Sequence, residues 1–104
     1  MIIQLNTDKN LTIHSEYEAQ ITEKLNKDLD RFSEHISRIE VHMSDENGSK
    51  AGVNDKKCLL EARIEGKQPV AASDLGDTYD LALKGATEKL KNALNTIVSK
   101  MQAH

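Results

Sequence analysis

The spacing of apolar residues changes twice along this chain, and these changes limit the folds that it can adopt. Between residues 15 and 36, apolar side chains recur every three or four positions, which places them along one face of a helix. Between residues 38 and 64 the period falls to two, as in strands with one buried face. From residue 79 the helical spacing returns. The sequence therefore predicts two helices separated by strands, with apolar faces that need a shared core.

The first predicted helix begins at Ser15, which precedes Glu18 with the spacing of a capping box. In a capping box, each side chain satisfies a backbone N–H that would otherwise lack a partner at the helix start. A short strand over residues 2–5 and a polar turn over residues 6–10 come before this helix. The apolar stripe that should face the core is Tyr17, Ile21, Leu25, Leu29, Phe32 and Ile36.

The central part of the chain predicts strands. Ile39, Val41 and Met43 should point to one side of a strand, and Arg38, Glu40, His42 and Ser44 to the other. A polar, glycine-bearing loop follows over residues 44–57, and alternation then resumes at Cys58, Leu60, Ala62 and Ile64. Gly66 and Lys67 suit a tight turn. A last strand is expected over residues 69–72, at a sheet edge, because Pro69 has no N–H to donate.

The second predicted helix is capped by Asp74 or Asp77. Gly85 inside it should cost about 1 kcal/mol relative to alanine, which is tolerable where close packing needs it. Its stripe is Tyr79, Leu83, Ala86, Leu90, Leu94, Ile97 and Met101. The predicted fold is α+β, in the order β-α-β-β-β-α, with a four-stranded sheet that carries both helices on one face. We expect residues 1–104 to form a single domain.

The charge balance argues against bulk attraction to polyanions. The net charge is −3 and the pI is about 5.8, which disfavours non-specific binding to DNA or to an anionic membrane. Any contact with RNA must come from a local patch. Residues 75–104 carry four basic and three acidic side chains, so this segment has the charge balance most favourable to phosphate. The amino-terminal residues carry neither a signal-peptide pattern nor a membrane span, so a cytoplasmic protein is expected.

Residues that could support catalysis or metal binding are sparse. Cys58 has no second cysteine to pair with and stands among apolar neighbours, which predicts a buried thiol. The four histidines form no short-spaced pair with one another or with Cys58, so no metal site is expected. The sequence contains no glycine-rich phosphate loop and no nucleophile elbow. We therefore expect a binding protein that needs no cofactor, rather than an enzyme.

Several short strings, in their order and spacing, resemble the ribosome hibernation promoting factor and ribosome-associated translation inhibitor family. They are Thr22-Glu23-Lys24-Leu25-Asn26-Lys27, Val70-Ala71-Ala72, Asp77-Thr78-Tyr79 and Glu88-Lys89-Leu90. The resemblance spans nearly the whole chain. It implies a fold like that of double-stranded RNA binding domains and a protein that occupies the messenger and transfer RNA channel of the small ribosomal subunit, silencing translation under stress.

The resemblance also implies which residues contact ribosomal RNA. Lys24, Lys27 and Lys89 are the matched basic positions, and Arg31 and Lys91 are added because helical spacing places them nearby. Lys56 and Lys57, at the far end of the loop over residues 44–57, form a second candidate contact. Tyr17, Phe32 and Tyr79 lie on the predicted core stripes, so recognition should rest on backbone and shape rather than on base stacking.

Two features keep an alternative open. Glu16, Glu23, Asp30 and Glu34 lie beside the basic residues of the first helix, and i, i+4 pairs with acidic residues would partly neutralise the lysines. Relatives in the family also carry a lysine-rich end to the second helix, where this chain has residues 94–99 without a lysine. The alternative is a divergent member that has lost RNA binding and contacts a protein through the free sheet face, with Arg38, Glu40, His42, Glu61 and Arg63.

Overall fold

The computed structural model describes residues 1–7, 15–45 and 56–102. The elements are β1 (Ile2–Thr7), α1 (Ser15–Asp28), a short 3-10 helix η1 (Asp30–Phe32), β2 (Ile36–Asp45), β3 (Lys56–Ile64), β4 (Val70–Gly76) and α2 (Tyr79–Gln102). The predicted order β-α-β-β-β-α and the α+β class are confirmed.

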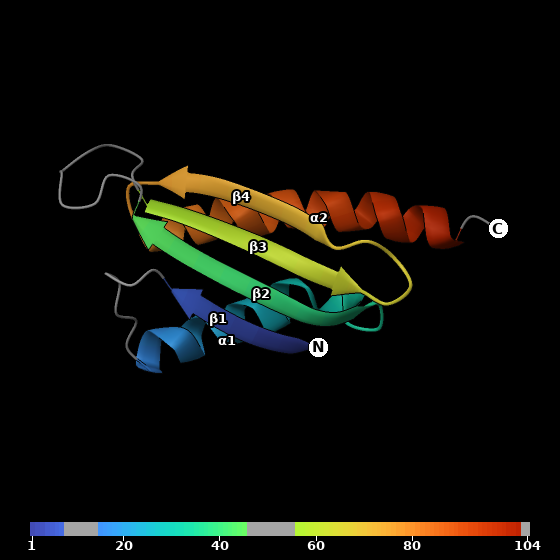
Figure 1. Cartoon of the computed structure of the whole chain (residues 1–104), viewed down its shortest axis with the longest axis horizontal. Helices are drawn as coiled ribbons and strands as arrows, with labels where there is room; N and C mark the ends of the chain where they lie inside the picture. The colour runs from blue at the N-terminus through green and yellow to red at the C-terminus, as the bar shows by residue number, and fades with distance from the viewer. Residues whose placement is uncertain (8–14, 46–55, 103–104) are drawn as a thin grey trace.

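The strands form one mixed sheet in the order β1-β2-β3-β4 (Figure 1). β1 pairs with β2 in parallel, and α1 lies in the crossover that a parallel pair requires. β2 pairs with β3, and β3 with β4, in antiparallel fashion. β1 and β4 are therefore the two edges of the sheet, so the edge position predicted for the last strand is confirmed.

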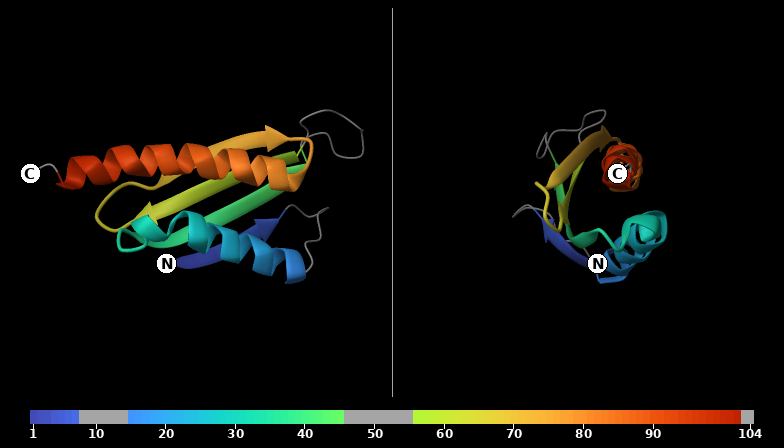
Figure 2. Two further views of the ribbon diagram at one scale, coloured as in Figure 1. Left: turned by 180° about the vertical axis from the view of Figure 1, so that it is seen from behind. Right: turned by 90° about the vertical axis from the view of Figure 1, so that its right-hand side faces the viewer.

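Both helices cover the same face of the sheet (Figure 2). The core lies between them and the inward side chains of β2 and β3, and Leu25, Ile39, Leu60 and Leu90 in it are fully buried. The opposite sheet face is not covered by any element in the described ranges. This face carries the outward residues of β2 and β3, as the alternation predicts.

The first helix is shorter than its apolar stripe. α1 ends at Asp28, and the chain continues through η1, where Phe32 N–H donates to Leu29 O (2.9 Å) and Ser33 N–H donates to Asp30 O (3.0 Å). Leu29 and Phe32 are buried nonetheless, and Ile36 begins β2. A three-residue spacing suits a 3-10 turn as well as an α-helix, so the period could not mark where α1 ends.

The start of the second helix differs from the prediction. β4 continues past Ala72 to Gly76, so Asp74 lies inside the strand and its proposed capping role is wrong. Thr78 caps α2 instead, because its hydroxyl oxygen accepts a hydrogen bond from Leu81 N–H (3.1 Å). The turn before β4 is as predicted, with Gly66 at a φ of 77° and Lys67 N–H donating to Ile64 O (3.1 Å).

Gly85 is required by close packing of α2 against β4. A Cβ atom built at Gly85 would overlap the carboxylate of Asp74 and approach the Asp74 Cβ to 3.0 Å. At Gly85, α2 and β4 are thus so close that only a hydrogen atom fits in the place of a side chain.

Candidate nucleic-acid interface

The basic residues expected to contact RNA occupy three places in the structure. One group lies on α1 and η1, a second at the start of β3, and a third on α2. In that order they are Lys24, Lys27 and Arg31, then Lys56 and Lys57, then Lys89 and Lys91. The fold brings only some of these groups together.

A hollow of about 360 Å³ lies between α1 and α2. It is lined on the α1 side by Tyr17, Gln20 and Lys24, and on the α2 side by Asp80 and Lys84. We call this hollow the interhelical groove. It brings Lys24 to the same surface as Lys84, a lysine of α2 that the sequence analysis did not select.

Lys84 could have been found from its spacing. Lys84 and Lys91 stand seven residues apart on α2, so they share one flank of that helix. Because Lys84 faces α1 across the groove, Lys91 lies on the α1 side as well. The groove flank of α2 therefore supplies two lysines, and α1 supplies Lys24.

A tyrosine bridges the two helices inside the groove. The Tyr17 hydroxyl donates a hydrogen bond to the Asp80 carboxylate (2.8 Å). Burial, and next to it the hydrogen bond to Asp80, raise the pKa of Tyr17 well above its usual value, so this side chain stays a neutral donor. The bridge fixes the position of Asp80 beside Lys84 and leaves one carboxylate in the wall of the groove.

The basic ridge expected on α1 is only partly present. Lys24 Nζ lies 3.0 Å from Asp28 Oδ2, and Lys27 is exposed in the last turn. Arg31 lies in η1, with its guanidinium 5.0 Å from the centre of the Phe32 ring. The helical spacing that placed Arg31 beside Lys24 and Lys27 does not hold, because α1 ends at Asp28.

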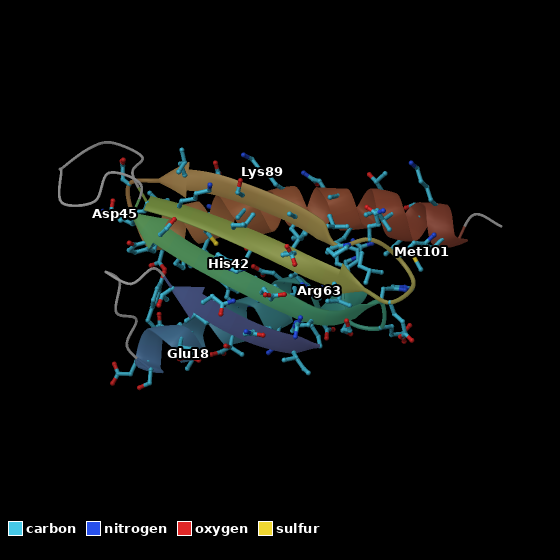
Figure 3. All side chains as sticks on the ribbon, in the orientation of Figure 1. Glu18, His42, Asp45, Arg63, Lys89 and Met101 are labelled. Atoms are coloured by element: carbon cyan, nitrogen blue, oxygen red, sulfur yellow. The ribbon has the colours of Figure 1, made fainter. Side chains whose placement is uncertain are left out.

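Lys89 and Lys91 lie on opposite flanks of α2. The two residues are separated by about 200° around the helix axis. Lys89 Nζ donates to Ser73 O (3.2 Å) and lies 3.3 Å from Asp74 Oδ1, so this side chain turns toward β4 and away from α1 (Figure 3). A basic surface that continues from α1 can therefore reach Lys91 but not Lys89.

Lys56 and Lys57 belong to β3 rather than to a loop. The strand pairing of Asp45 with Lys56 and of Ser44 with Lys57 extends the hairpin beyond its predicted ends. Lys56 Nζ lies 3.0 Å from Asp45 Oδ2 and 5.9 Å from the centre of the Tyr79 ring. Lys57 projects from the open face and lines a hollow that also contains Lys89. Residues 46–55 of the expected loop lie outside the described residues.

Acidic residues interrupt the basic surface unevenly. Glu23 lines a separate hollow on the outer side of α1, together with Ser15 and Glu18, and so lies outside the groove. Glu88 is exposed and, by helical spacing, lies close to the flank of Lys84 and Lys91. The groove thus combines lysines of both helices with acidic neighbours, and phosphate binding to it should be moderate in strength.

The open sheet face carries a network of paired charges. The Glu40 carboxylate accepts from Arg63 Nε (2.9 Å) and from Arg38 (3.3 Å), and Arg63 also lies 3.2 Å from Glu61. The Arg63 hydrogen bond is the main cause of a lowered pKa at Glu40. His42 lies 3.9 Å from Glu40, and Figure 3 shows His42 and Arg63 on this face. Arginines and glutamates balance here, so the face offers little net attraction to phosphate.

Comparison with known proteins identifies the family. The family model described as sigma 54 modulation protein / S30EA ribosomal protein matches residues 6–102. The chain belongs to this family. The membership confirms the resemblance stated from the sequence and makes the chain a member of a ribosome-associated protein family. A search of curated proteins gave no match.

Two solved structures share the fold. The N-terminal domain of Protein Y from Thermus thermophilus aligns with a TM-score of 0.73 at 20% identity, over 93% of this chain and 99% of that domain. A ribosomal subunit interface protein from Coxiella burnetii aligns with a TM-score of 0.70 at 20% identity, over 95% of this chain and 99% of its own. At this identity the two structures establish the architecture.

Within residues 1–7, 15–45 and 56–102, no group of three or more His, Cys, Asp or Glu side chains is placed to hold a metal ion. In the same ranges, no helix is both long and apolar enough to cross a membrane.

Proposed function

We propose that this S30EA-family protein binds the small ribosomal subunit through the interhelical groove and its basic flanks, and thereby represses translation in ribosome hibernation under stress. The observation that carries the proposal is the convergence of Lys24 from α1 and Lys84 from α2 on one groove, in a chain of a ribosome-associated family. Lys27, Arg31 and Lys91 extend this surface in the proposal. The protein acts by occupancy in the cytoplasm, as one domain, and catalyses no reaction.

The chemistry of the groove suits an RNA backbone. Lysine ammonium groups bind phosphate as point charges, and their long side chains adjust to the spacing of successive phosphates. Tyr17 is the one aromatic residue among the described residues that line the groove, and its ring is partly buried against the core with its hydroxyl bound to Asp80, which disfavours stacking on a base. Recognition of backbone and shape is therefore favoured over reading of sequence.

Lys56, Lys57 and Lys89 are weaker candidates for the same contact. Lys56 is paired with Asp45, and Lys89 is held by Ser73 and Asp74 at the β4 side of α2. Lys57 lies on the open sheet face, whereas the groove lies between helices on the opposite face. RNA that follows the groove would have to pass over α2 to reach Lys89 and around the β4 edge to reach Lys57.

Binding to separated ribosomal subunits tests the subunit choice, and translation in a cell-free extract tests repression. We expect the protein to pellet with small subunits at near-physiological salt, to stay in the supernatant with large subunits, and to lower protein synthesis as its concentration rises. Equal pelleting with both subunits would contradict the small-subunit proposal. Binding without any fall in synthesis would contradict repression.

A protein partner on the open sheet face is the second candidate function. Three observations favour it. No element of the described residues covers this face, its arginines and glutamates neutralise one another, and the side chain of Leu75 is exposed at its β4 side. Such a mixed surface resembles the rim and core of a transient protein interface more than a phosphate site. An Arg63→Glu variant should lose the partner and keep ribosome binding; loss of ribosome binding in this variant would contradict the division of roles.

A further inference from the structure

A second hollow, of about 510 Å³, lies at the other end of α2, between the last turns of that helix and the start of β4. Volumes of this size are in the range of about 300–1,000 Å³ that is usual for ligand pockets. Its floor is apolar, formed by Pro69, Val70, Ile97 and Met101. Its rim carries Lys67 and Lys100, and Gln68 completes the lining. We call it the terminal cleft.

The charge of the terminal cleft is positive only. Both ionisable residues that line it are lysines, and both are exposed. Glu65, the nearest acidic residue along the chain, is exposed in the β3–β4 connection and does not line the cleft. In contrast to the interhelical groove, where Asp80 stands beside the lysines, the terminal cleft therefore presents two cations with no carboxylate among the described lining residues.

The terminal cleft is remote from the proposed RNA surface. Ile97 stands thirteen residues after Lys84, which is about 20 Å along α2. Lys100 also lies close to the flank of Lys89, on the β4 side of the helix, and Figure 3 shows Met101 near the carboxyl end of α2. A partner in the cleft would leave the interhelical groove accessible.

We propose that the terminal cleft docks an extended acidic peptide segment that carries branched apolar side chains. An apolar side chain of the segment would cover Val70, Ile97 and Met101, and flanking carboxylates would pair with Lys67 and Lys100. Methionine adapts its shape to different apolar partners, which suits a floor of this kind. An RNA backbone fits less well, because it would cover the apolar floor with polar groups and the described lining residues include no aromatic side chain to stack on a base. The acidic peptide would be a second partner, beside the ribosomal RNA that we propose for the interhelical groove.

The test uses a fluorescein-labelled peptide with the sequence Gly-Asp-Leu-Asp-Leu-Asp-Gly, titrated with the full chain at near-physiological salt and followed by fluorescence anisotropy. We expect saturable binding that weakens about tenfold or more in the Lys67→Glu/Lys100→Glu variant. Peptides with serine in place of leucine, or asparagine in place of aspartate, should weaken similarly. The Lys24→Glu/Lys84→Glu variant carries the same charge change in the groove, and it should bind the peptide within about twofold of wild type.

A second measurement uses only wild-type protein, so it does not depend on whether the variants fold. The methyl resonance of Met101 in wild-type protein should shift as the peptide is added. Four results would overturn the inference. They are no saturation of the anisotropy up to about 1 mM protein, equal affinity for the leucine-free peptide, displacement of the peptide by single-stranded RNA at lower concentration, or a dimer of wild type that Lys67→Glu/Lys100→Glu abolishes. The last result would assign the cleft to a second copy of this chain. None of these outcomes bears on ribosome binding, which the groove variant reports separately.

Discussion

Replacing Gly85 with alanine tests how closely α2 approaches the edge strand. In an open helix position, alanine in place of glycine stabilises by about 1 kcal/mol. At Gly85 the added methyl group overlaps the Asp74 carboxylate, which must move away from Leu75 N–H (2.9 Å) and from Lys89 Nζ (3.3 Å). Overpacking costs about 1–3 kcal/mol, and breaking the hydrogen bond from Leu75 N–H to the Asp74 carboxylate costs about a further 1 kcal/mol. After the gain of about 1 kcal/mol in helix propensity is subtracted, we expect a net loss of about 1–3 kcal/mol in the free energy of unfolding.

Urea denaturation followed by circular dichroism measures this loss, and a double-mutant cycle assigns it to Asp74. In an Asp74→Ala background the carboxylate is gone, and the cost of Gly85→Ala should fall by about 1 kcal/mol or more. The exposed helix position Asn92, changed to alanine, serves as a control for helix propensity. A Gly85→Ala protein as stable as wild type, with Asp74 present, would refute the close approach described here.

Three further predictions follow from single residues. Leu25→Ala removes a fully buried side chain and should lower the free energy of unfolding by about 2–5 kcal/mol, measured by urea denaturation; a loss below about 1 kcal/mol would contradict its core position. Thr78→Ala removes the cap of α2 and should cost about 1 kcal/mol, whereas Thr78→Ser should retain most of the stability. Burial raises the pKa of the Cys58 thiol to about 12, above its unfolded value of about 8.5, so the folded state keeps the proton longer. Its contribution to stability is complete below the unfolded pKa and is lost as the pH rises toward 12, so thermal melts at pH 8 to 11 should show a decline that Cys58→Ala reduces.

The strands and the core were predictable because their signals are local. Alternation at Ile39, Val41 and Met43 requires a strand with one buried face, and the structure buries these side chains. The order of elements then left one simple arrangement, with both helices on one face of the sheet. Neither step depends on knowing which strands are neighbours.

The start of α1 at Ser15 is confirmed, whereas the end of α1 and the cap of α2 were predicted incorrectly. Leu29 and Phe32 keep the spacing of α1, but that spacing also fits the 3-10 turn that follows it. Ser73 and Asp74 are poor strand formers, yet pairing with Leu59 and Cys58 holds them in β4 and shifts the helix cap to Thr78. At β4 the pairing with a neighbouring strand decided where the element ends, and at α1 a local change of helix type did.

The prediction of which lysines share one surface was also partly wrong. Lys89 belongs to a string that resembles the family, but its partners Ser73 and Asp74 lie on a strand whose place beside α2 could not be known from spacing. Lys84 was overlooked although its seven-residue separation from Lys91 already placed both on one flank. Its approach to Lys24 required the relative placement of two helices, which helical periodicity does not provide.

Ribosome binding by paired charge-reversal variants tests the central claim most directly. The groove variant Lys24→Glu/Lys84→Glu and the matched variant Lys67→Glu/Lys100→Glu change the net charge equally, and all four lysines are at least partly exposed, so both variants should fold. Co-sedimentation with small subunits over a series of salt concentrations then measures affinity. We predict that wild type and the Lys67/Lys100 variant pellet alike, while the groove variant binds more weakly, with a salt slope smaller by about two. If the groove variant binds as wild type does, the interhelical groove is not the RNA contact and the account is wrong.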